Sequence, residues 1–402
     1  MNVLFATPYL PCPPDFGGAR RMYELIRGVR RLSDLQILSM TDQGSDLGAT
    51  EAELGSVVPV PVPFTARSVS MRKRRMLQLR SLASCESAQH HLYINAAYQL
   101  ALDRLIATGE IDLVQFEFSQ MGGYRVQGGV PTVLDIHNVE HDLMRRMASS
   151  GSSGRRLFNA IEYRKFRREE LDAWRNATCC VATSGLDAEV VSRHVGREVP
   201  LIPSGVDLDY FTPLSMDQSR PGTIAFIGAM RYRPNAEGAR FFAEKVFSLV
   251  RSSNPDSSFT VVGADPTPEV QALSSIPGVT VTGTVPDVRP WLESAEVVAV
   301  PLLSGGGTRI KILEAFAAGR PVVSTSIGAE GIDVVDREHL LKADDPSVFA
   351  QAVVELMRDR ALRERLTADA LTLVRERYQW SAIAERLGNL HAELVHASHP
   401  AR

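Results

Sequence analysis

Glycines and charged residues gather in the segment 301–331, PLLSGGGTRIKILEAFAAGRPVVSTSIGAEG. The apolar run before Pro301 predicts a strand, and the residues from about Thr308 predict a helix. Glycines let a ligand approach the backbone closely, and the free N–H groups at the start of a helix bind anions. Arg309 and Lys311 add two cations beside that helix start. The segment therefore predicts a binding site for a phosphate or a diphosphate.

Glu314 stands about one and a half turns into the same predicted helix. A carboxylate there can accept both hydroxyls of a ribose, as the acidic residue of dinucleotide-binding folds does. The apolar residues AFAAG and a strand that starts at Pro321 follow directly, so we expect Glu314 at the ligand-binding end of a βαβ unit. A Gly-rich turn followed by a solvated, charged helix is the alternative interpretation.

Strands that could position these residues recur along the chain. Short apolar runs alternate with amphipathic stretches, which is typical of βαβ units with a parallel sheet covered on both faces. Ligands of such sheets bind beyond the carboxyl ends of the strands, so a cleft between two such domains is the expected site. We expect strands at 3–7, 35–40, 113–116, 132–136, 178–183, 199–203, 223–227, 259–262, 279–282, 297–301 and 321–324. We expect helices at 19–31, 92–107, 157–175, 235–250, 308–318, 346–376 and 380–396.

The alternation pauses once, at 204–222, a stretch rich in Pro, Asp and Ser. A chain of 402 residues is long enough for two domains. We therefore expect one Rossmann-like domain at 1–203, a linker at 204–222, a second Rossmann-like domain at 223–378 and a closing helix at 379–402. Asp207 and Asp209 imitate a metal-binding Asp-x-Asp motif, but they lie in this linker, and we expect no metal there.

Composition excludes several classes of protein. With 44% hydrophobic and 23% charged residues the chain has ordinary globular composition, and its net charge of −3 argues against a broadly basic nucleic-acid binder. The first residues, MNVLFATPYLP, lack the basic start and the long apolar core of a signal peptide. Because no run approaches the ~18 apolar residues that span a bilayer, we expect a cytoplasmic protein whose membrane contact, if it has one, is peripheral.

The segment ILEAFAAGRPVVST resembles the signature of glycosyltransferase family 4, the retaining group-1 enzymes of the GT-B fold. That signature carries a Glu, seven intervening residues and a second Glu, which in the family holds the nucleotide's ribose. Glu314 matches the second Glu, whereas the first would fall at Gly306 and is absent. The resemblance implies that the backbone of Gly307 and Thr308 takes over the contacts with the donor sugar.

Other motifs extend the resemblance over nearly the whole chain. The run PYLPCPPDFGGARR resembles the family's first Gly-rich loop, in which Gly17 and Gly18 open a helix near the diphosphate and the acceptor. VLDIHNVE resembles the segment whose histidine, here His137, sits beside the donor sugar; taken alone, a structural histidine is the alternative. FIGAMRYRPNAEG resembles the start of the donor domain, where Arg231 is the nearest candidate for the diphosphate and the family's Lys is missing.

The resemblance implies an α/β, GT-B fold with two doubly wound domains facing across a cleft, and a C-terminal helix that returns to the first domain. The first domain would bind the acceptor and the second a UDP- or GDP-type nucleotide-sugar. Retaining transfer to a sugar, lipid-linked or small-molecule acceptor, without metal or other cofactor, is the expected reaction, in polysaccharide or glycoconjugate biosynthesis. His137 would position the donor sugar, and Arg309 and Lys311 would stabilise the leaving diphosphate. A nucleotide-sugar 2-epimerase and a non-catalytic nucleotide-sugar-binding protein are the alternatives.

The segment 67–80 is the most basic part of the chain. It carries six basic residues and no acid, with Met and Leu residues interleaved. One interpretation is a solvated helix or a loop. The other is a docking patch for anionic lipid or a lipid-linked acceptor at the inner face of the membrane, because clustered basic residues are attracted to anionic surfaces. The basic residues are Arg67, Arg72, Lys73, Arg74, Arg75 and Arg80.

Overall fold

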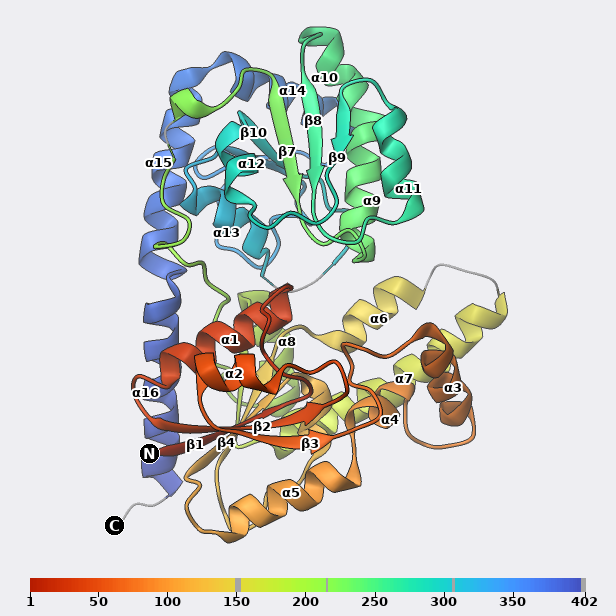
Figure 1. The fold of residues 1–402 in the computed structure, drawn as a ribbon, viewed down its shortest axis with the longest axis vertical. Helices are drawn as coiled ribbons and strands as arrows, with labels where there is room; N and C mark the ends of the chain where they lie inside the picture. The colour runs from red at the N-terminus through yellow and green to blue at the C-terminus, as the bar shows by residue number, and fades with distance from the viewer. Residues whose placement is uncertain (149–152, 215, 306–307, 399–402) are drawn as a thin grey trace. The chain divides into compact units, whose positions relative to one another are not determined.

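The computed structural model describes residues 1–148, 153–214, 216–305 and 308–398 of the chain (Figure 1). The chain forms two compact units. The first consists of Met1–Pro203 together with Ser381–Arg402, and the second of Ser204–Trp380. The predicted linker therefore lies within the second unit.

A six-stranded parallel sheet with strand order β3-β2-β1-β4-β5-β6 forms the centre of the first unit. The prediction of a strand at 199–203 is wrong, because there only Leu201 forms a single bridge, to Ala182. The strand β3, VVPVP, was not predicted. It lies at the edge of the sheet, where prolines are tolerated. The strands are β1 (Asn2–Thr7), β2 (Asp34–Thr41), β3 (Val57–Pro61), β4 (Leu113–Glu117), β5 (Thr132–Ile136) and β6 (Cys179–Ala182).

Helices flank this sheet, and the predicted helix at 92–107 is in fact two. The break falls at Ile94–Asn95, where the Asn95 side chain caps the second helix through the N–H of Ala97. The helices are α1 (Gly17–Val29), α2 (Leu47–Leu54), α3 (Met71–Leu82), α4 (Ala88–Tyr93), α5 (Ala96–Ala107), the 3-10 turn η1 (Ser119–Gly123), α6 (Glu140–Ala148), α7 (Ser153–Asn176), α8 (Gly185–Val195) and α16 (Trp380–Ser398).

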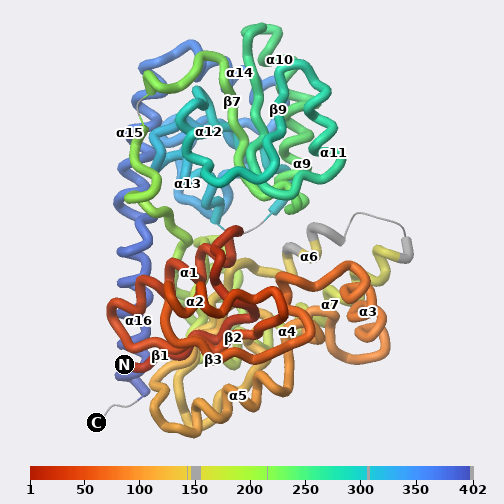
Figure 2. The backbone as a smooth tube through the Cα atoms, in the orientation of Figure 1, coloured from red at the N-terminus to blue at the C-terminus, as the bar shows by residue number. Residues whose placement is uncertain are grey.

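The C-terminal helix α16 belongs to the first unit, as the resemblance predicts. Figure 2 shows it in blue beside the red N-terminal segments of the chain. A Cβ atom at Gly28 of α1 would collide with the Ala384 side chain, so the two helices touch without intervening side chains. On the same helix the buried His391 packs edge-on against Phe5 of β1, with ring centroids 6.2 Å apart. These contacts fix α16 directly over the start of the chain.

The second unit repeats the architecture, with parallel strand order β12-β11-β10-β7-β8-β9. The predicted helix at 235–250 begins at Arg233 and contains a π turn, and the one predicted at 346–376 breaks at Asp359, which caps α15. The strands are β7 (Thr223–Ile227), β8 (Ser258–Val262), β9 (Val279–Val281), β10 (Val297–Val300), β11 (Val322–Ser324) and β12 (Leu341–Lys342). The main helices are α9 (Arg233–Phe241), α10 (Phe247–Ser253), α11 (Pro268–Gln271), α12 (Arg289–Ser294), α13 (Ile310–Ala317), α14 (Pro346–Arg358) and α15 (Arg360–Arg377).

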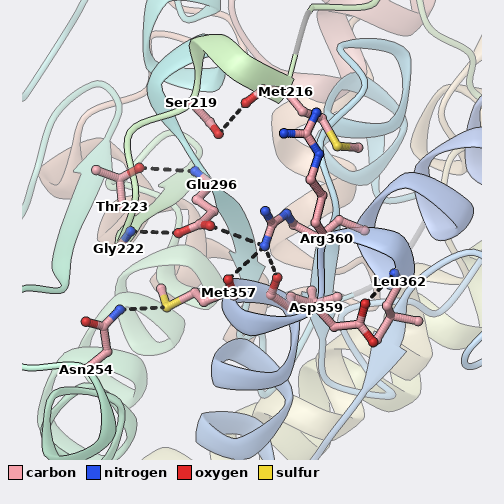
Figure 3. A network of polar contacts seen from close by, with 12 residues as sticks. Met216, Ser219, Gly222, Thr223, Asn254, Glu296, Met357, Asp359, Arg360 and Leu362 are labelled. Carbon is pink, nitrogen blue, oxygen red and sulfur yellow. Dashed lines mark hydrogen bonds and ion pairs between the residues drawn. The ribbon is translucent and has the colours of Figure 1, made fainter.

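A polar network holds α15 and the segment before β7 to this sheet (Figure 3). The buried Glu296, just before β10, accepts a hydrogen bond of 2.6 Å from the backbone N–H of Gly222. Its other oxygen forms an ion pair of 3.2 Å with Arg363 of α15. This network lies at the amino ends of the strands, so it supports the fold and leaves the carboxyl ends free for a ligand.

In both sheets the strand order reverses at the first strand of the unit. Strand β1 lies between β2 and β4, and strand β7 lies between β8 and β10. Ligands of doubly wound sheets bind outside the carboxyl ends of the strands at this switch point. The turns that follow β1 and β4, and those that follow β7 and β10, are therefore the expected sites.

Among the described helices, none has both the length and the apolar character needed to cross a membrane.

Candidate functional site

Arg309 stands at the switch point of the second unit, at the N-cap of α13. The helix begins at Ile310, two residues later than predicted. The Arg309 side chain is only 6% exposed; its guanidinium donates to the backbone oxygen of Ile327 at 3.2 Å and forms an ion pair of 3.8 Å with Glu330. This cation is thus held in a buried position at the carboxyl end of β10.

Lys311 joins the two turns at this switch point. Its Nζ donates to Oδ1 of Asn235, on α9, at 2.5 Å, and lies 4.6 Å from the centre of the Phe226 ring. The Asn235 side chain is itself fixed, because its Nδ2 donates to the backbone oxygen of Ala229 at 2.9 Å. Burial, and then the nearby charge of Arg309, lower the pKa of Lys311 to about 7. A bound anion would therefore stabilise the charged form of Lys311.

Glu314 lies on α13 three residues after Lys311 and is half-buried. Its charge acts in the opposite direction to burial and raises the pKa of Lys311. Thr308, just before the helix, accepts a long hydrogen bond of 3.5 Å from the backbone N–H of Ser204. The predicted donor-binding residues Gly306 and Gly307 lie outside the residues that the structure describes.

Arg231 lies on the turn between β7 and α9, at the same edge of the sheet. Its guanidinium forms an ion pair of 2.8 Å with Asp265, and 49% of its side chain is exposed. Arg231 is therefore a more exposed cation than the buried Arg309. The Asp207 carboxylate accepts the backbone N–H groups of Asp209 and Tyr210 at 2.9 and 3.0 Å, so the Asp-x-Asp sequence forms a turn.

His137 stands at the matching edge of the first unit, directly after β5. Its side chain is buried, with 6% exposure, and its Nε2 lies 2.9 Å from Oε2 of Glu117 at the end of β4. The same nitrogen lies 3.8 Å from Oδ2 of Asp135. Its backbone oxygen accepts from the hydroxyl of Thr183 at 3.1 Å. Both the ring and the backbone of His137 are thus fixed.

Arg21 and Asp135 form a buried pair beside His137. Arg21 lies one turn into α1, and its Nε and Nη2 donate to the two carboxylate oxygens of Asp135 at 2.9 Å each. Burial, and then the charge of Asp135, raise the pKa of Glu117. Neither Arg21 nor Glu117 was predicted from the sequence as a site residue. A signal for Glu117 was present, because Gln115 and Glu117 put two polar groups on one face of an apolar strand.

The donor atoms of Glu117, Asp135 and His137 lie within 4.8 Å of one another, near enough to share one metal ion. The Arg21 guanidinium, however, already occupies both oxygens of Asp135. A divalent cation beside that guanidinium would meet a like charge. The residues present therefore fit an ion-pair network better than a metal site.

Gly17 and Gly18 open α1 at this same edge. A Cβ atom at Gly18 would lie 2.9 Å from Cζ of Phe118, so the Phe118 ring takes the space of a side chain. That ring stacks on the imidazole of His137 with centroids 3.8 Å apart. The structure thus brings Gly18 and His137 together around Phe118, a residue not predicted from the sequence, and Gly17 directly precedes Gly18 on α1.

Part of the chain matches a known family. Residues 221–359 match the model of the family described as glycosyl transferases group 1. The chain is 30% identical over 216 residues to phosphatidyl-myo-inositol mannosyltransferase of Mycobacterium leprae, covering 52% of this chain and 57% of that protein. It is 30% identical over 242 residues to D-inositol 3-phosphate glycosyltransferase of Xylanimonas cellulosilytica, covering 53% and 56%. The chain thus spans little more than half the length of these relatives.

Solved structures resemble the whole chain. Sucrose-phosphate synthase of Thermosynechococcus elongatus superposes with a TM-score of 0.73 at 18% identity, covering 99% of this chain and 100% of that one. Anabaena HepE, solved in complex with UDP and glucose, superposes with a TM-score of 0.67 at 14% identity, covering 98% and 99%. At such identities the likeness concerns the fold. The comparisons thus show that the chain has the GT-B fold and that its residues 221–359 are similar to glycosyl transferases group 1.

Proposed function

We propose that this chain is a retaining glycosyltransferase that moves a sugar from a UDP- or GDP-type nucleotide-sugar to an acceptor in polysaccharide or glycoconjugate biosynthesis. One observation carries the proposal: Arg309, Lys311 and Glu314 gather on the first turns of α13, at the switch point between β7 and β10. Two cations suit a diphosphate, and the carboxylate suits the ribose hydroxyls beside it.

The proposed reaction needs no metal ion. When the bond to the anomeric carbon breaks, positive charge develops on the sugar and negative charge on the departing diphosphate. Arg309 and Lys311 would stabilise that negative charge, since buried, prearranged donors act strongly on charge that appears in the transition state. Gly17, Gly18, Arg231 and Thr308 would complete the donor site. His137 would position the donor sugar, and the diphosphate would accept the proton of the attacking hydroxyl on the same face.

A panel of nucleotide-sugars and acceptors tests this function. The cognate donor should stabilise the chain against heat, by about 2.7 kcal/mol at 100 times its dissociation constant. Transfer to an acceptor with retained configuration, followed by NMR in excess EDTA, is the expected result. Turnover without any acceptor would instead indicate an epimerase, and stabilisation without turnover under any condition would indicate a binding protein. Loss of activity in EDTA, restored by a divalent metal, would overturn the metal-independent mechanism.

We further propose that α3 docks the enzyme on the inner face of an anionic membrane, where a lipid-linked acceptor would lie. The helix exposes apolar side chains between its basic residues: Met71 is 68%, Met76 57%, Leu79 69% and Leu82 53% exposed. Its end is held rigidly, because Lys165 of α7 donates to the backbone oxygens of Ser81 and Ser84 at 2.5 and 2.8 Å. One of the relatives is named for a lipid, phosphatidyl-myo-inositol, which supports this acceptor class.

Co-sedimentation with vesicles tests the docking proposal. Binding should require anionic lipid and fade with added salt, because screening weakens each basic contact. Changing residues 72–75 to Gln should abolish it. The matched control changes four exposed arginines of the second unit to Gln: Arg240, Arg358, Arg360 and Arg375. Equal loss in both variants, or a wild-type protein that stays in the supernatant at low salt, would exclude docking by α3.

A further inference from the structure

A continuous line of buried hydrogen bonds leads from α16 to His137. His391 Nε2 lies 2.7 Å from Oε1 of Gln115 on β4. Nε2 of Gln115 donates to Oε1 of Glu117 at 2.8 Å, and Oε2 of Glu117 lies 2.9 Å from Nε2 of His137. Three of the four side chains are fully buried, and His137 is 6% exposed. Water therefore does not compete for these bonds.

The direction of each bond in this line follows from its donors. The amide N–H of Gln115 faces Glu117, so its oxygen faces His391 and must accept from the Nε2–H of that ring. The Nδ1 of His391 is buried without a hydrogen-bond partner, and burial lowers the pKa of His391 to about 4, so the ring is neutral. At the other end, Oε1 of Glu117 accepts from Gln115, and in the carboxylate form of Glu117 the second oxygen is an acceptor as well. The hydrogen between Glu117 and His137 is then carried by Nε2 of His137.

The backbone after β4 allows two successive residues to hold the same imidazole. In a regular strand the side chains of Glu117 and Phe118 would point to opposite faces of the sheet. Phe118 instead has a φ of 72°, a left-handed conformation that is uncommon for a bulky residue. Its ring can therefore stack on His137 while Glu117 bonds the edge of the same ring. Strained conformations of this kind persist at functional sites.

Resting on the proposed function, we propose that Glu117 is a positioning residue, held by Gln115 and His391, that keeps the proton of His137 on Nε2 and turns Nδ1 toward the substrate. Nε2 is occupied by Glu117, and one face of the ring is covered by Phe118. Nδ1 is the polar atom of the ring that remains for a hydroxyl of the donor sugar. Because neutral Nδ1 can only accept, it would bind a hydroxyl by accepting its hydrogen.

The charges around Glu117 agree with this role. Asp135 lies beside it, but Arg21 of α1 neutralises Asp135 through two hydrogen bonds. Gln115 and His391 contribute neutral groups from β4 and α16. Among the groups described around His137, Glu117 therefore has the largest influence on which ring nitrogen carries the proton. This dependence can be measured directly.

Ring-nitrogen NMR of the full chain, labelled with ¹⁵N-histidine, provides a test without substrate. His137→Asn assigns the His137 signals. In the wild-type protein we expect the tautomer protonated on Nε2 at pH 8. Glu117→Gln should let His137 populate both tautomers, whereas Glu117→Asp should retain the Nε2-protonated form in part. A wild-type His137 protonated on Nδ1, or a tautomer unchanged in Glu117→Gln, would overturn the proposal.

Kinetics separates this proposal from the proposed function. Glu117→Gln should lower kcat about 10- to 100-fold with little change in the KM of the donor or in Tm, and should alter the pH profile of kcat. If Glu117→Gln fails to fold, the distant His391→Gln replaces it, with a smaller loss and the same change in tautomer. If the tautomer of His137 depends on Glu117 but the chain transfers no sugar, the positioning role of Glu117 stands and the proposed glycosyltransferase function fails. If the chain transfers sugar normally but the tautomer is unchanged in Glu117→Gln, the proposed function stands and the positioning role fails.

Discussion

The two switch points carry charge in opposite ways. In the first unit Arg21 and Asp135 neutralise each other through two bonds of 2.9 Å, and Glu117 meets His137 at the same distance. In the second unit the ion pair of Arg309 with Glu330 measures 3.8 Å, and Lys311 bonds a neutral amide. Burial first, and then the charge of Arg309, lower the pKa of Lys311. The Arg21–Asp135 pair is thus formed without a ligand, whereas we propose that the cations of the second site meet an anionic ligand.

The sharpest test of this difference exchanges one buried arginine in each unit for Met. Arg21→Met would leave the Asp135 carboxylate buried without its partner, which should lower the free energy of unfolding by about 3–5 kcal/mol. Arg309→Met removes a cation whose partner Glu330 lies 3.8 Å away and is 28% exposed, so its cost should be smaller, about 1 kcal/mol. Urea unfolding followed by circular dichroism measures both. Equal costs would mean that the two sites do not differ in charge balance.

A second test removes the cations of the second site together. Changing both Arg309 and Lys311 to Ala should lower kcat roughly 100- to 1000-fold and raise the KM of the donor less, because the diphosphate gains charge in the transition state. Steady-state kinetics with the cognate nucleotide-sugar decides it. Arg240→Ala is the control, since this exposed arginine of the same unit pairs with Glu244 and is not assigned to the donor site. A rise in KM alone would assign the two residues to uniform binding.

Much of the fold could be predicted from the sequence, and the failures share a cause. Strands buried on both faces, such as β1 and β7, form continuous apolar runs with clear ends. Edges lack this signal: β3 contains two prolines, and the run at 199–203 is apolar because it packs against β6 without joining the sheet as a strand. Helix breaks at Asn95 and Asp359 were missed because a single capping residue inside a helical pattern looks like any surface residue.

The candidate site was predictable only in part. Arg309, Lys311 and Glu314 stand close together in the sequence, so one motif predicts them. The partners that determine their chemistry come from elsewhere, as Asn235 does for Lys311. The partners of His137 also come from elsewhere in the chain, because the structure buries it between Phe118 and Glu117. His137→Ala would therefore leave a buried carboxylate without this partner, and His137→Asn is the better variant.

A third test concerns the carboxylate of the second site. Glu314→Gln should weaken binding of the cognate nucleoside diphosphate by about 1.5–3 kcal/mol, since it loses charge-assisted bonds to the ribose. This corresponds to roughly 10- to 100-fold in affinity. Titration calorimetry with UDP and GDP measures it, and Glu355→Gln, on the distant helix α14, serves as the control. An unchanged dissociation constant would remove Glu314 from the nucleotide site.

The smallest expected effect is a change in the protonation of Lys311 when a diphosphate binds. It tests directly whether the second switch point differs from the first. Its pKa of about 7 means that Lys311 is largely neutral at pH 8 in the free protein. A bound diphosphate favours the charged form, so binding should take up nearly one proton at pH 8, and affinity should fall as pH rises, by at most roughly tenfold per unit above pH 7.

Calorimetric titration of the cognate nucleoside diphosphate in buffers of different ionisation enthalpy measures this uptake. Lys311→Arg is the matched variant, because a guanidinium stays charged throughout this range and should bind without taking up a proton. Tight binding by the wild-type chain with no proton uptake at pH 8 would mean that the anion does not meet Lys311. If proton uptake disappears in Lys311→Arg but persists in Glu117→Gln, the proton is taken up by Lys311 in the second unit and not by the residues around Glu117. That result is expected if the first site is already balanced by Arg21 and the second depends on its ligand.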